Sequence, residues 1–326
     1  INTASGGGND NTDPGYYFSI LVGDTLYFSA RQGSQDTEPW AYDTSNHSTW
    51  RVADINSGYT SSIPGQFMSI LVGDTIYFDA IGGTSGNELW AHDTSNYSTW
   101  LVADIWPQSN VGSVPGQHMS MLVGDTIYFD ADDGVNSREL WAHQPAEITT
   151  LSNGSGSGSN SGTYNGNGTA WMVKDIFSGS SSSSPTSLTA VGNTLYFQAD
   201  DGTNGAELWK SDGTASGTVM VKDINTGSGN NFASYFTAVG NTLYLSADDG
   251  TNGNELWKSD GTASGTVMVK DIRSGSVGSI PAHHTAVGNT LYFTADDGTN
   301  GAELWKSDGT ASGTVMVKDI NTGSGN

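Results

Sequence analysis

The chain has 326 residues, no cysteine and a formal net charge of −23, with only 11 basic residues. Disulfides therefore do not hold the fold, and a nucleic-acid partner is excluded because phosphate binding needs clustered Lys and Arg. No run of about 18 apolar residues is present, so we expect no membrane insertion. The acidic surface favours cations and neutral polar ligands.

One segment recurs six times along the chain. Each copy has Val-Gly-(Asp/Asn)-Thr before a tryptophan and an Asp-Ile pair after it. Successive tryptophans are 50, 51, 68, 48 and 48 residues apart. A period of this length is typical of solenoids, propellers and other repeat arrays. The six tryptophans are Trp40, Trp90, Trp141, Trp209, Trp257 and Trp305.

Each copy predicts four short strands joined by tight turns. In the fourth copy they cover residues 187–191, 194–199, 206–210 and 218–224, all rich in Tyr, Phe, Trp, Val and Thr. Gly192-Asn193 and Asp212-Gly213 are hairpin signals between these runs. An open β-solenoid is the alternative, but it needs shorter parallel coils. No stretch has a sustained helical period, so we expect very little helix.

We therefore predict an all-β fold, a six-bladed β-propeller with four antiparallel strands per blade. All four strands of a blade lie within one repeat, so we expect no exchange of a terminal strand. The prediction is a single domain over 1–326, with blades at 14–55, 64–105, 115–176, 185–224, 232–272 and 281–320.

The third copy carries an insertion of about 20 residues, at 144–168. It is rich in Gly, Ser, Asn and Thr, a composition typical of flexible segments. We predict a flexible loop between the third and fourth strands of this copy.

The copies fall into two classes. Copies one to three have Ala after the tryptophan, whereas copies four to six continue with Lys-Ser-Asp-Gly-Thr. Residues 207–214, 255–262 and 303–310 read Glu-Leu-Trp-Lys-Ser-Asp-Gly-Thr. This motif resembles the ELWxxDGT repeat family of secreted and surface-attached prokaryotic proteins. The resemblance implies a tandem, propeller-like extracellular module and no particular activity.

An acidic motif, Asp-Asp-Gly-x-Asn, recurs between the second and third strands of copies three to six. Calcium prefers six to eight oxygen ligands, and closely spaced Asp and Asn supply them. The alternative is turn chemistry, because Asp and Asn side chains stabilise turns. Both interpretations stay open, and Ca²⁺ is the candidate cofactor. The candidate ligands are Asp132, Asp133, Asn136, Asp200, Asp201, Asn204, Asp248, Asp249, Asn252, Asp296, Asp297 and Asn300.

The residues of the first strand differ from copy to copy, whereas the rest of the repeat is nearly constant. Three of the six histidines lie there, and histidine is a common base and metal ligand. In a six-bladed propeller the third and sixth copies are opposite, so His118 would face His283 or His284 across a central channel. Irregular packing of that channel is the alternative. The candidate ligand-binding residues are Tyr17, Phe67, His118, Tyr235, His283 and His284.

The sequence favours a non-enzymatic binding or adhesion module, extracellular or on the cell surface, that recognises a glycan or a surface protein through one face. No nucleophile elbow, zinc-protease motif or P-loop is present, so no catalytic residue is predicted. One alternative is a hydrolase, such as a metal-dependent lactonase or a glycan-cleaving enzyme, with one site in the central channel. Another is a structural repeat of a longer surface fibre.

Overall fold

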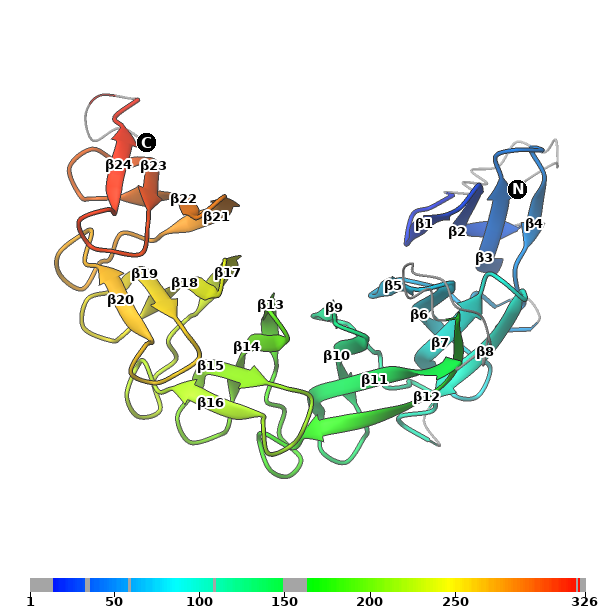
Figure 1. Ribbon diagram of the computed structural model, residues 1–326. Coiled ribbons are helices and arrows are strands. Elements are labelled where there is room, and N and C mark those ends of the chain that lie inside the picture. Colours follow the sequence, from blue (N-terminus) through cyan, green and yellow to red (C-terminus); the bar gives the residue numbers. More distant parts are fainter. Residues whose placement is uncertain are drawn as a thin grey trace, which may run out of the picture. The chain divides into compact units, whose positions relative to one another are not determined.

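The computed structural model describes residues 14–32, 36–57, 60–107, 110–148, 163–320 and 322. Within these ranges it contains six separate antiparallel sheets of four strands each and no helix (Figure 1). The predicted all-β fold with six four-stranded blades is confirmed. The residues form two compact units, 1–172 and 173–326. Closure of the blades into one propeller domain stays a prediction.

The first unit contains blades 1 to 3. Its strands are β1 (Ser19–Val22), β2 (Thr25–Gln32), β3 (Asp36–Asp43), β4 (Thr49–Arg51), β5 (Ser69–Val72), β6 (Thr75–Ile81), β7 (Asn87–Asp93), β8 (Ser98–Ala103), β9 (Ser120–Val123), β10 (Thr126–Asp132), β11 (Arg138–Ile148) and β12 (Thr163–Lys174), whose last two residues belong to the second unit.

The second unit contains blades 4 to 6. Its strands are β13 (Thr186–Val191), β14 (Thr194–Asp200), β15 (Ala206–Ser211), β16 (Val219–Lys222), β17 (Ser234–Val239), β18 (Thr242–Asp248), β19 (Asn254–Ser259), β20 (Val267–Lys270), β21 (Ala282–Val287), β22 (Thr290–Asp296), β23 (Ala302–Ser307) and β24 (Val315–Lys318).

Each sheet is made of strands consecutive in the sequence, so no described blade borrows a strand from another. The predicted hairpin at Gly192-Asn193 joins β13 to β14, and Gly192 has φ 60°, a conformation glycine adopts at little cost. The four strands predicted for the fourth copy all form, with bounds within three residues of the prediction.

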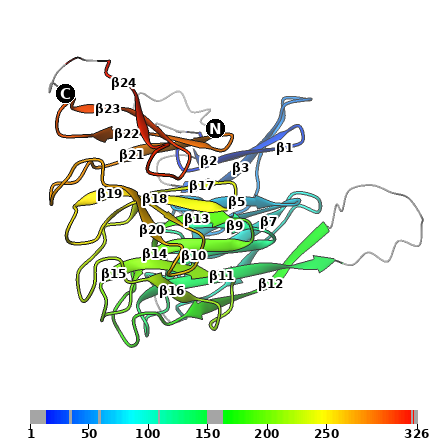
Figure 2. The same cartoon turned by 60° about the vertical axis from the view of Figure 1, so that its left-hand side comes forward.

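The predicted loop over 144–168 is wrong at both of its ends. β11 continues to Ile148 and β12 begins at Thr163, so the third blade carries a long two-stranded ribbon (Figure 2). Antiparallel pairing satisfies backbone groups even where glycine and asparagine dominate, and composition alone did not indicate this. The remaining part of the prediction, 149–162, lies outside the described residues.

A buried glutamate ties each blade to the connection that follows it. Glu207 in β15 is fully buried, and its carboxylate accepts hydrogen bonds from the Ile224 N–H at 2.8 Å and the Asn231 side chain at 2.9 Å. Burial raises the pKa of Glu207 to about 7, against the opposing effect of these donors. The same role, an acceptor for N–H groups of the connection, is taken by Glu38, Glu88, Glu255 and Glu303.

The core lies between neighbouring blades. Leu208 of blade 4 is fully buried in a cluster with Leu243 and Trp257 of blade 5, and Leu256 of blade 5 is buried against Leu291 of blade 6. A four-stranded sheet is too thin to enclose a core, so each blade depends on its neighbours.

Two imidazoles also lie at the junctions between blades of the first unit. His92 of blade 2 packs on Tyr27 of blade 1 at a ring distance of 5.3 Å, and His143 of blade 3 packs on Tyr77 of blade 2 at 5.0 Å. Burial lowers the pKa of each histidine to about 4. Both rings are therefore neutral at pH 7.

The described residues include no helix that could span a membrane.

We predict that Glu207→Ala lowers the free energy of unfolding by about 3 kcal/mol, because it leaves several buried donors without an acceptor. Urea unfolding followed by tryptophan fluorescence measures the change. Glu207→Gln, which keeps one acceptor oxygen, should cost less. Thr203→Ala, in an exposed turn, should change the free energy by less than about 0.5 kcal/mol. Equal losses in all three variants would contradict the anchoring role.

We predict that acid destabilises the chain through His92. Its pKa is about 4 in the folded state and about 6.5 when unfolded, so the unfolded state binds a proton first. The stability contributed by the neutral ring is present above pH 6.5 and is lost as the pH falls toward 4, by on the order of 3 kcal/mol.

His92→Tyr provides the matched comparison, because blade 1 has Tyr42 at the same place in the repeat. Melting temperatures at pH 7 and pH 4.5 should fall less in this variant than in the original chain. The same fall in both would show that His92 does not titrate on unfolding.

Candidate functional site

The first strands of blades 4 to 6 each contain a β-bulge. In β17, Ser234 pairs with Ser246 and Thr237 pairs with Tyr244, so Tyr235 and Phe236 together oppose one residue of β18. Tyr235 has φ 54°. Bulges re-aim a side chain, and non-glycine residues with positive φ are often found where function requires them.

The same bulge recurs in the neighbouring first strands. His283 in β21 has φ 57° and Ser187 in β13 has φ 60°. The strand β1 of blade 1 pairs with β2 without a register shift. The first strands of the two classes therefore differ in backbone geometry as well as in sequence.

The bulges bring together three of the predicted ligand-binding residues. The ring of Tyr235 lies 5.9 Å from His283 and 5.7 Å from His284, and His284 lies edge-on to Phe293 at 5.8 Å. We call these four residues the aromatic–imidazole cluster. Tyr235 is 46% exposed and His283 is exposed, whereas His284 is half-buried beneath them.

His284 is a desolvated histidine, like His92 and His143. Burial lowers its pKa to about 4, and the neighbouring His283 adds to this effect. Neither ring nitrogen makes a hydrogen bond of normal geometry to the described residues, although the Tyr235 backbone lies near enough to oppose the lowering of the pKa. A buried polar group without a partner costs about 1–3 kcal/mol and is more common at functional sites than elsewhere.

Two exposed apolar residues precede the cluster. Phe232 is 63% exposed and Ile280 is 61% exposed, and both have positive φ, 49° and 50°. Each lies three residues before the bulged residue of its blade, Tyr235 or His283. The sequence interpretation missed them. The available signal was a large apolar residue in a connection rich in Gly, Ser and Asn.

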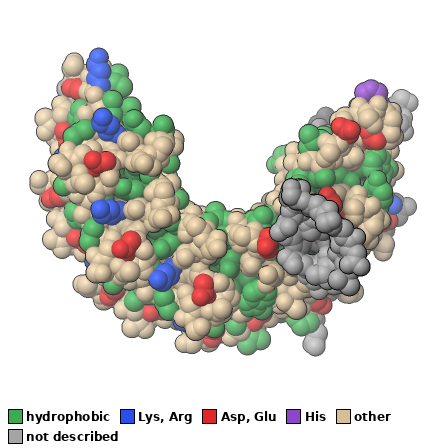
Figure 3. All heavy atoms as spheres, viewed as in Figure 1, with side chains coloured by type: hydrophobic (Ala, Val, Ile, Leu, Met, Phe, Trp, Pro, Cys, Tyr) green, Lys and Arg blue, Asp and Glu red, His purple; other side chains and the backbone are tan. Residues whose placement is uncertain are grey.

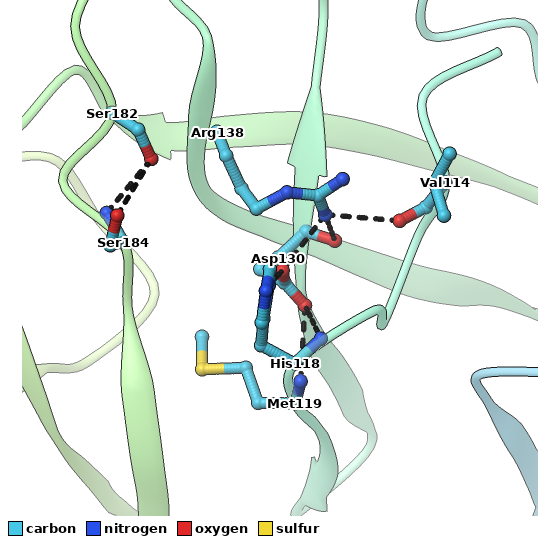
Figure 4. A network of polar contacts seen from close by, with 7 residues as sticks. All are labelled: Val114, His118, Met119, Asp130, Arg138, Ser182 and Ser184. Atoms are coloured by element: carbon cyan, nitrogen blue, oxygen red, sulfur yellow. Dashed lines mark hydrogen bonds and ion pairs between the residues drawn. The ribbon is translucent and has the colours of Figure 1, made fainter. Parts of the chain in front are cut away.

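His118 belongs to a second, polar cluster in blade 3 (Figure 4). Asp130 in β10 is fully buried, and one carboxylate oxygen lies 2.8 Å from His118 Nδ1 and 2.8 Å from Arg138 Nη1. The other oxygen accepts the backbone N–H groups of His118 and Met119, both at 3.1 Å. The His118 side chain is 49% exposed, so a buried carboxylate holds an accessible imidazole.

The position of Asp130 is occupied by Ser29 in blade 1 and by Asp79 in blade 2, and the contacts of these two residues show which contacts occur in blade 3 alone among the three. Asp79 accepts the N–H groups of Phe67 and Met68, and its second oxygen binds the Asn87 side chain. Ser29 accepts the N–H group of Tyr17 at 3.0 Å. The position therefore holds the backbone before the first strand in each of these three blades. Among the described residues of these three blades, only blade 3 places an imidazole and a guanidinium on it.

Tyr17 and Phe67, the other predicted binding residues, precede the first strands of blades 1 and 2. Tyr17 packs edge-on against Tyr16 at 4.9 Å, and Phe67 is half-buried. The expectation that His118 faces His283 or His284 stays a prediction, because these residues belong to different units.

The acidic loops form hydrogen-bonded turns. Asp201 accepts the N–H groups of Thr203 at 2.9 Å and Asn204 at 2.8 Å, and its second oxygen accepts the Asn204 side-chain amide. Burial raises the pKa of Asp201, but these donors outweigh it and hold the pKa below the ordinary value. Asp133, Asp249 and Asp297 make the same bonds. Donors thus occupy several of the oxygens that calcium would need.

The first residue of each acidic pair also accepts a backbone bond, as Asp200 does from Gly202 at 2.7 Å. Asp296 in addition pairs with Arg273 at 2.7 Å. The turn interpretation accounts for these contacts, and calcium binding by the loops stays a prediction that titration with Ca²⁺ checks.

Blade 1 holds an acidic trio that the sequence interpretation missed. Side-chain oxygens of Asp36, Glu38 and Asp54 lie within 4.8 Å of one another. Arg51 pairs with Asp36 at 3.2 Å and with Asp54 at 3.1 Å, which supplies the opposite charge. Burial raises the pKa of Asp36, and Arg51 counters this. Arg51 thus pairs with two of the three acids, and Glu38 instead accepts hydrogen bonds from the Ile55 N–H and the Ser62 hydroxyl.

The surface agrees with the charge composition. On the face seen in Figure 3, basic side chains lie singly among acidic and apolar ones and form no continuous patch over the described residues.

No family model matches the chain, and no curated protein does. Among solved structures, the chain is similar to puromycin hydrolase, with 12% identity and a TM-score of 0.46 over 92% of this chain and 44% of that one. It is also similar to the β-propeller domain of the Trilobed protease from Pyrococcus furiosus, with 9% identity, a TM-score of 0.40 and coverage of 92% and 83%.

A Mycobacterium tuberculosis puromycin-hydrolyzing peptidase is similar at 12% identity and a TM-score of 0.40, covering 95% of this chain and 53% of that chain. The chain spans less than half the length of the puromycin hydrolase structures that it matches. All these TM-scores are below 0.5, so the similarities carry no argument about activity.

Proposed function

We propose that the protein is an extracellular or cell-surface binding module that recognises carbohydrate through the aromatic–imidazole cluster of blades 5 and 6. The observation that supports this is the exposed ring of Tyr235, presented by a bulge and packed on two imidazoles. The resemblance to the ELWxxDGT repeats supports the extracellular setting.

The chemistry of the cluster suits a sugar. An aromatic ring offers a flat apolar surface to the C–H face of a pyranose, and polar groups at its edge bind the hydroxyls. Here Tyr235 supplies the flat surface and His283 an exposed polar edge. Phe232 and Ile280 extend the apolar area on the connections before β17 and β21.

The net charge of −23 supports a neutral ligand. An anionic glycan would meet repulsion over most of the surface, and the described residues of blades 5 and 6 offer only dispersed basic side chains. We therefore expect neutral oligosaccharides to bind better than sulfated or uronate-containing ones.

We predict that Tyr235→Ala weakens oligosaccharide binding at least tenfold, because it removes the stacking surface. A glycan array identifies the best-bound neutral oligosaccharide, and calorimetric titration then gives the dissociation constant for each variant. Phe232→Ala should weaken binding to a smaller degree.

Tyr97→Ala is the matched control. Tyr97 is 65% exposed, has φ 61° and lies in the turn between β7 and β8, a different place in the repeat from the first strand that carries Tyr235. Its loss should leave affinity unchanged. A flat response across a broad glycan panel, or an equal loss in the Tyr97 variant, would reject carbohydrate recognition at this site. A protein ligand would then be the binding alternative.

A hydrolase is the second candidate, and the polar cluster of blade 3 favours it. A buried carboxylate that orients an accessible imidazole is the arrangement of a general base with its positioning group. Asp130 and His118 have this relation at 2.8 Å. The described residues near them include no nucleophile of the usual motifs, so water would be the attacking group.

For this candidate we predict that His118→Ala lowers the hydrolysis of chromogenic lactone or glycoside substrates at least 100-fold, with unchanged melting temperature. Asp130→Asn should also lower the rate, together with the melting temperature, because Asp130 holds the backbone of His118 and Met119. Activity that is absent from a broad substrate panel, or that survives in His118→Ala, would leave the second candidate without support.

A further inference from the structure

The first strands of blades 4, 5 and 6 are neighbours within the second unit. The strands β13, β17 and β21 lie side by side (Figure 1). The hydroxyl of Thr189 in β13 donates to the Phe236 carbonyl of β17 at 3.3 Å, which links the first two strands. The ring of Tyr235 in β17 lies 5.9 Å from that of His283 in β21, which links the last two. All these contacts belong to one unit, so the order of the three strands is fixed.

The bulge occurs at the same place in each of the three strands. Its first residue is Ser187, Tyr235 or His283, with φ 60°, 54° or 57°. Tyr235 and His283 are exposed and Ser187 is half-buried. The second residue of the bulge is half-buried in all three strands, and in blade 5 it is Phe236, which packs on the core shared with blade 4. We call the three first residues the bulge row.

A ligand that contacts the whole bulge row crosses the strands. A ligand lying along a single first strand meets one bulged residue and then the regular ladder, which in β17 ends at the buried Val239. A linear chain of sugar rings that crosses the strands meets the three residues in turn. Successive rings of such a chain follow one another at an interval of the same order as the 5.9 Å between the rings of Tyr235 and His283.

The three residues differ in chemistry, so the row suits one extended ligand better than three separate ones. Tyr235 offers the largest flat apolar ring of the three and holds one sugar by stacking. The imidazole of His283 and the hydroxyl of Ser187 are hydrogen-bonding groups for the sugars on either side. A single hydrogen bond in water is too weak to hold a sugar by itself. These two groups therefore add affinity to a ligand that Tyr235 already holds.

A second set of equivalent residues shows the same order of polarity. Three residues before the bulge, blades 4, 5 and 6 have Ser184, Phe232 and Ile280, with φ 47°, 49° and 50°. Blade 4 thus has serine at both positions, whereas blades 5 and 6 have a ring in the bulge and an apolar side chain before it. Blade 4 provides the polar end of the site, and blade 5 provides its centre.

We propose that the bulge row binds an internal segment of a linear neutral glycan, at least three sugars long, with one sugar at each of blades 4, 5 and 6. The inference rests on the carbohydrate proposal and adds the length and course of the ligand. The chain crosses β13, β17 and β21 with its middle ring on Tyr235. A site of this kind recognises a polysaccharide along its length and does not require a free chain end.

A series of oligosaccharides of increasing length tests the extent of the site. The series has the linkage that the glycan array selects, from the monosaccharide upward, and calorimetric titration gives the dissociation constant and the stoichiometry. We expect the dissociation constant to fall at least about tenfold from the monosaccharide to the trisaccharide, and by less than about twofold for each further sugar. One trisaccharide should bind per chain.

Variants of Ser187 test whether the ligand reaches blade 4. Tyr235 shows that a tyrosine fits this bulge, so Ser187→Tyr should fold. It should strengthen trisaccharide binding at least about threefold, because it adds a second stacking surface, and should affect the monosaccharide less. Ser187→Ala should weaken trisaccharide binding about threefold and leave the monosaccharide unchanged. Ala215→Tyr, in the exposed turn between β15 and β16 of the same blade, is the matched control and should change neither.

The possible failures are distinguishable. A monosaccharide that binds as tightly as the trisaccharide, with binding still lost in Tyr235→Ala, would overturn the extended site and leave carbohydrate recognition intact. Affinity that rises with length but does not respond to either Ser187 variant would overturn the course over blade 4. A flat response across the glycan panel would reject the proposed function and this inference together.

Discussion

The interaction on which the fold depends is the hydrogen bonding of one buried glutamate per blade. A four-stranded sheet has two faces to cover, and its neighbour covers one of them only if the connection between blades returns at a fixed place. The glutamate fixes that place by accepting several N–H groups of the connection, as Glu207 does with Ile224 and Asn231. The Glu-Leu-Trp motif therefore combines the anchor of the connection with the leucine and tryptophan that the connection brings into contact.

The periodicity of the sequence was sufficient to predict the sheets. The fixed spacing of tryptophans and the Gly-Asn and Asp-Gly turns determined the number of blades, the strands of each and their antiparallel order. The extension of β11 and β12 into the insertion was not predictable in this way, because strand pairing depends on the partner backbone as well as on composition. The sequence pattern did not predict the bulges of blades 4 to 6 either. A bulge changes which residues are opposite without changing the number of residues in the repeat.

The candidate sites came from departures from the repeat. Comparison of equivalent positions drew attention to Tyr235, His283 and His284, whose rings lie together, and to His118, which contacts a buried aspartate. The partners Asp130 and Arg138 were missed because they lie on later strands, and only strand pairing brings them to His118. Phe232 and Ile280 were missed because they lie in the connections between blades, outside the strands of the repeat. The sequence pattern therefore does not reveal contacts between strands or the backbone conformation of turns.

The bulged residue in the first strand of blades 4, 5 and 6 has no pairing partner of its own, and this has an evolutionary consequence. Serine, tyrosine and histidine occupy it in blades 4, 5 and 6 while the surrounding ladder keeps the same register. A substitution there changes what the blade presents to a ligand without touching the hydrogen bonds that define the sheet. Duplication of a repeat followed by change at this one position is thus a short route to new specificity, in which selection for binding and selection for folding act on separate residues.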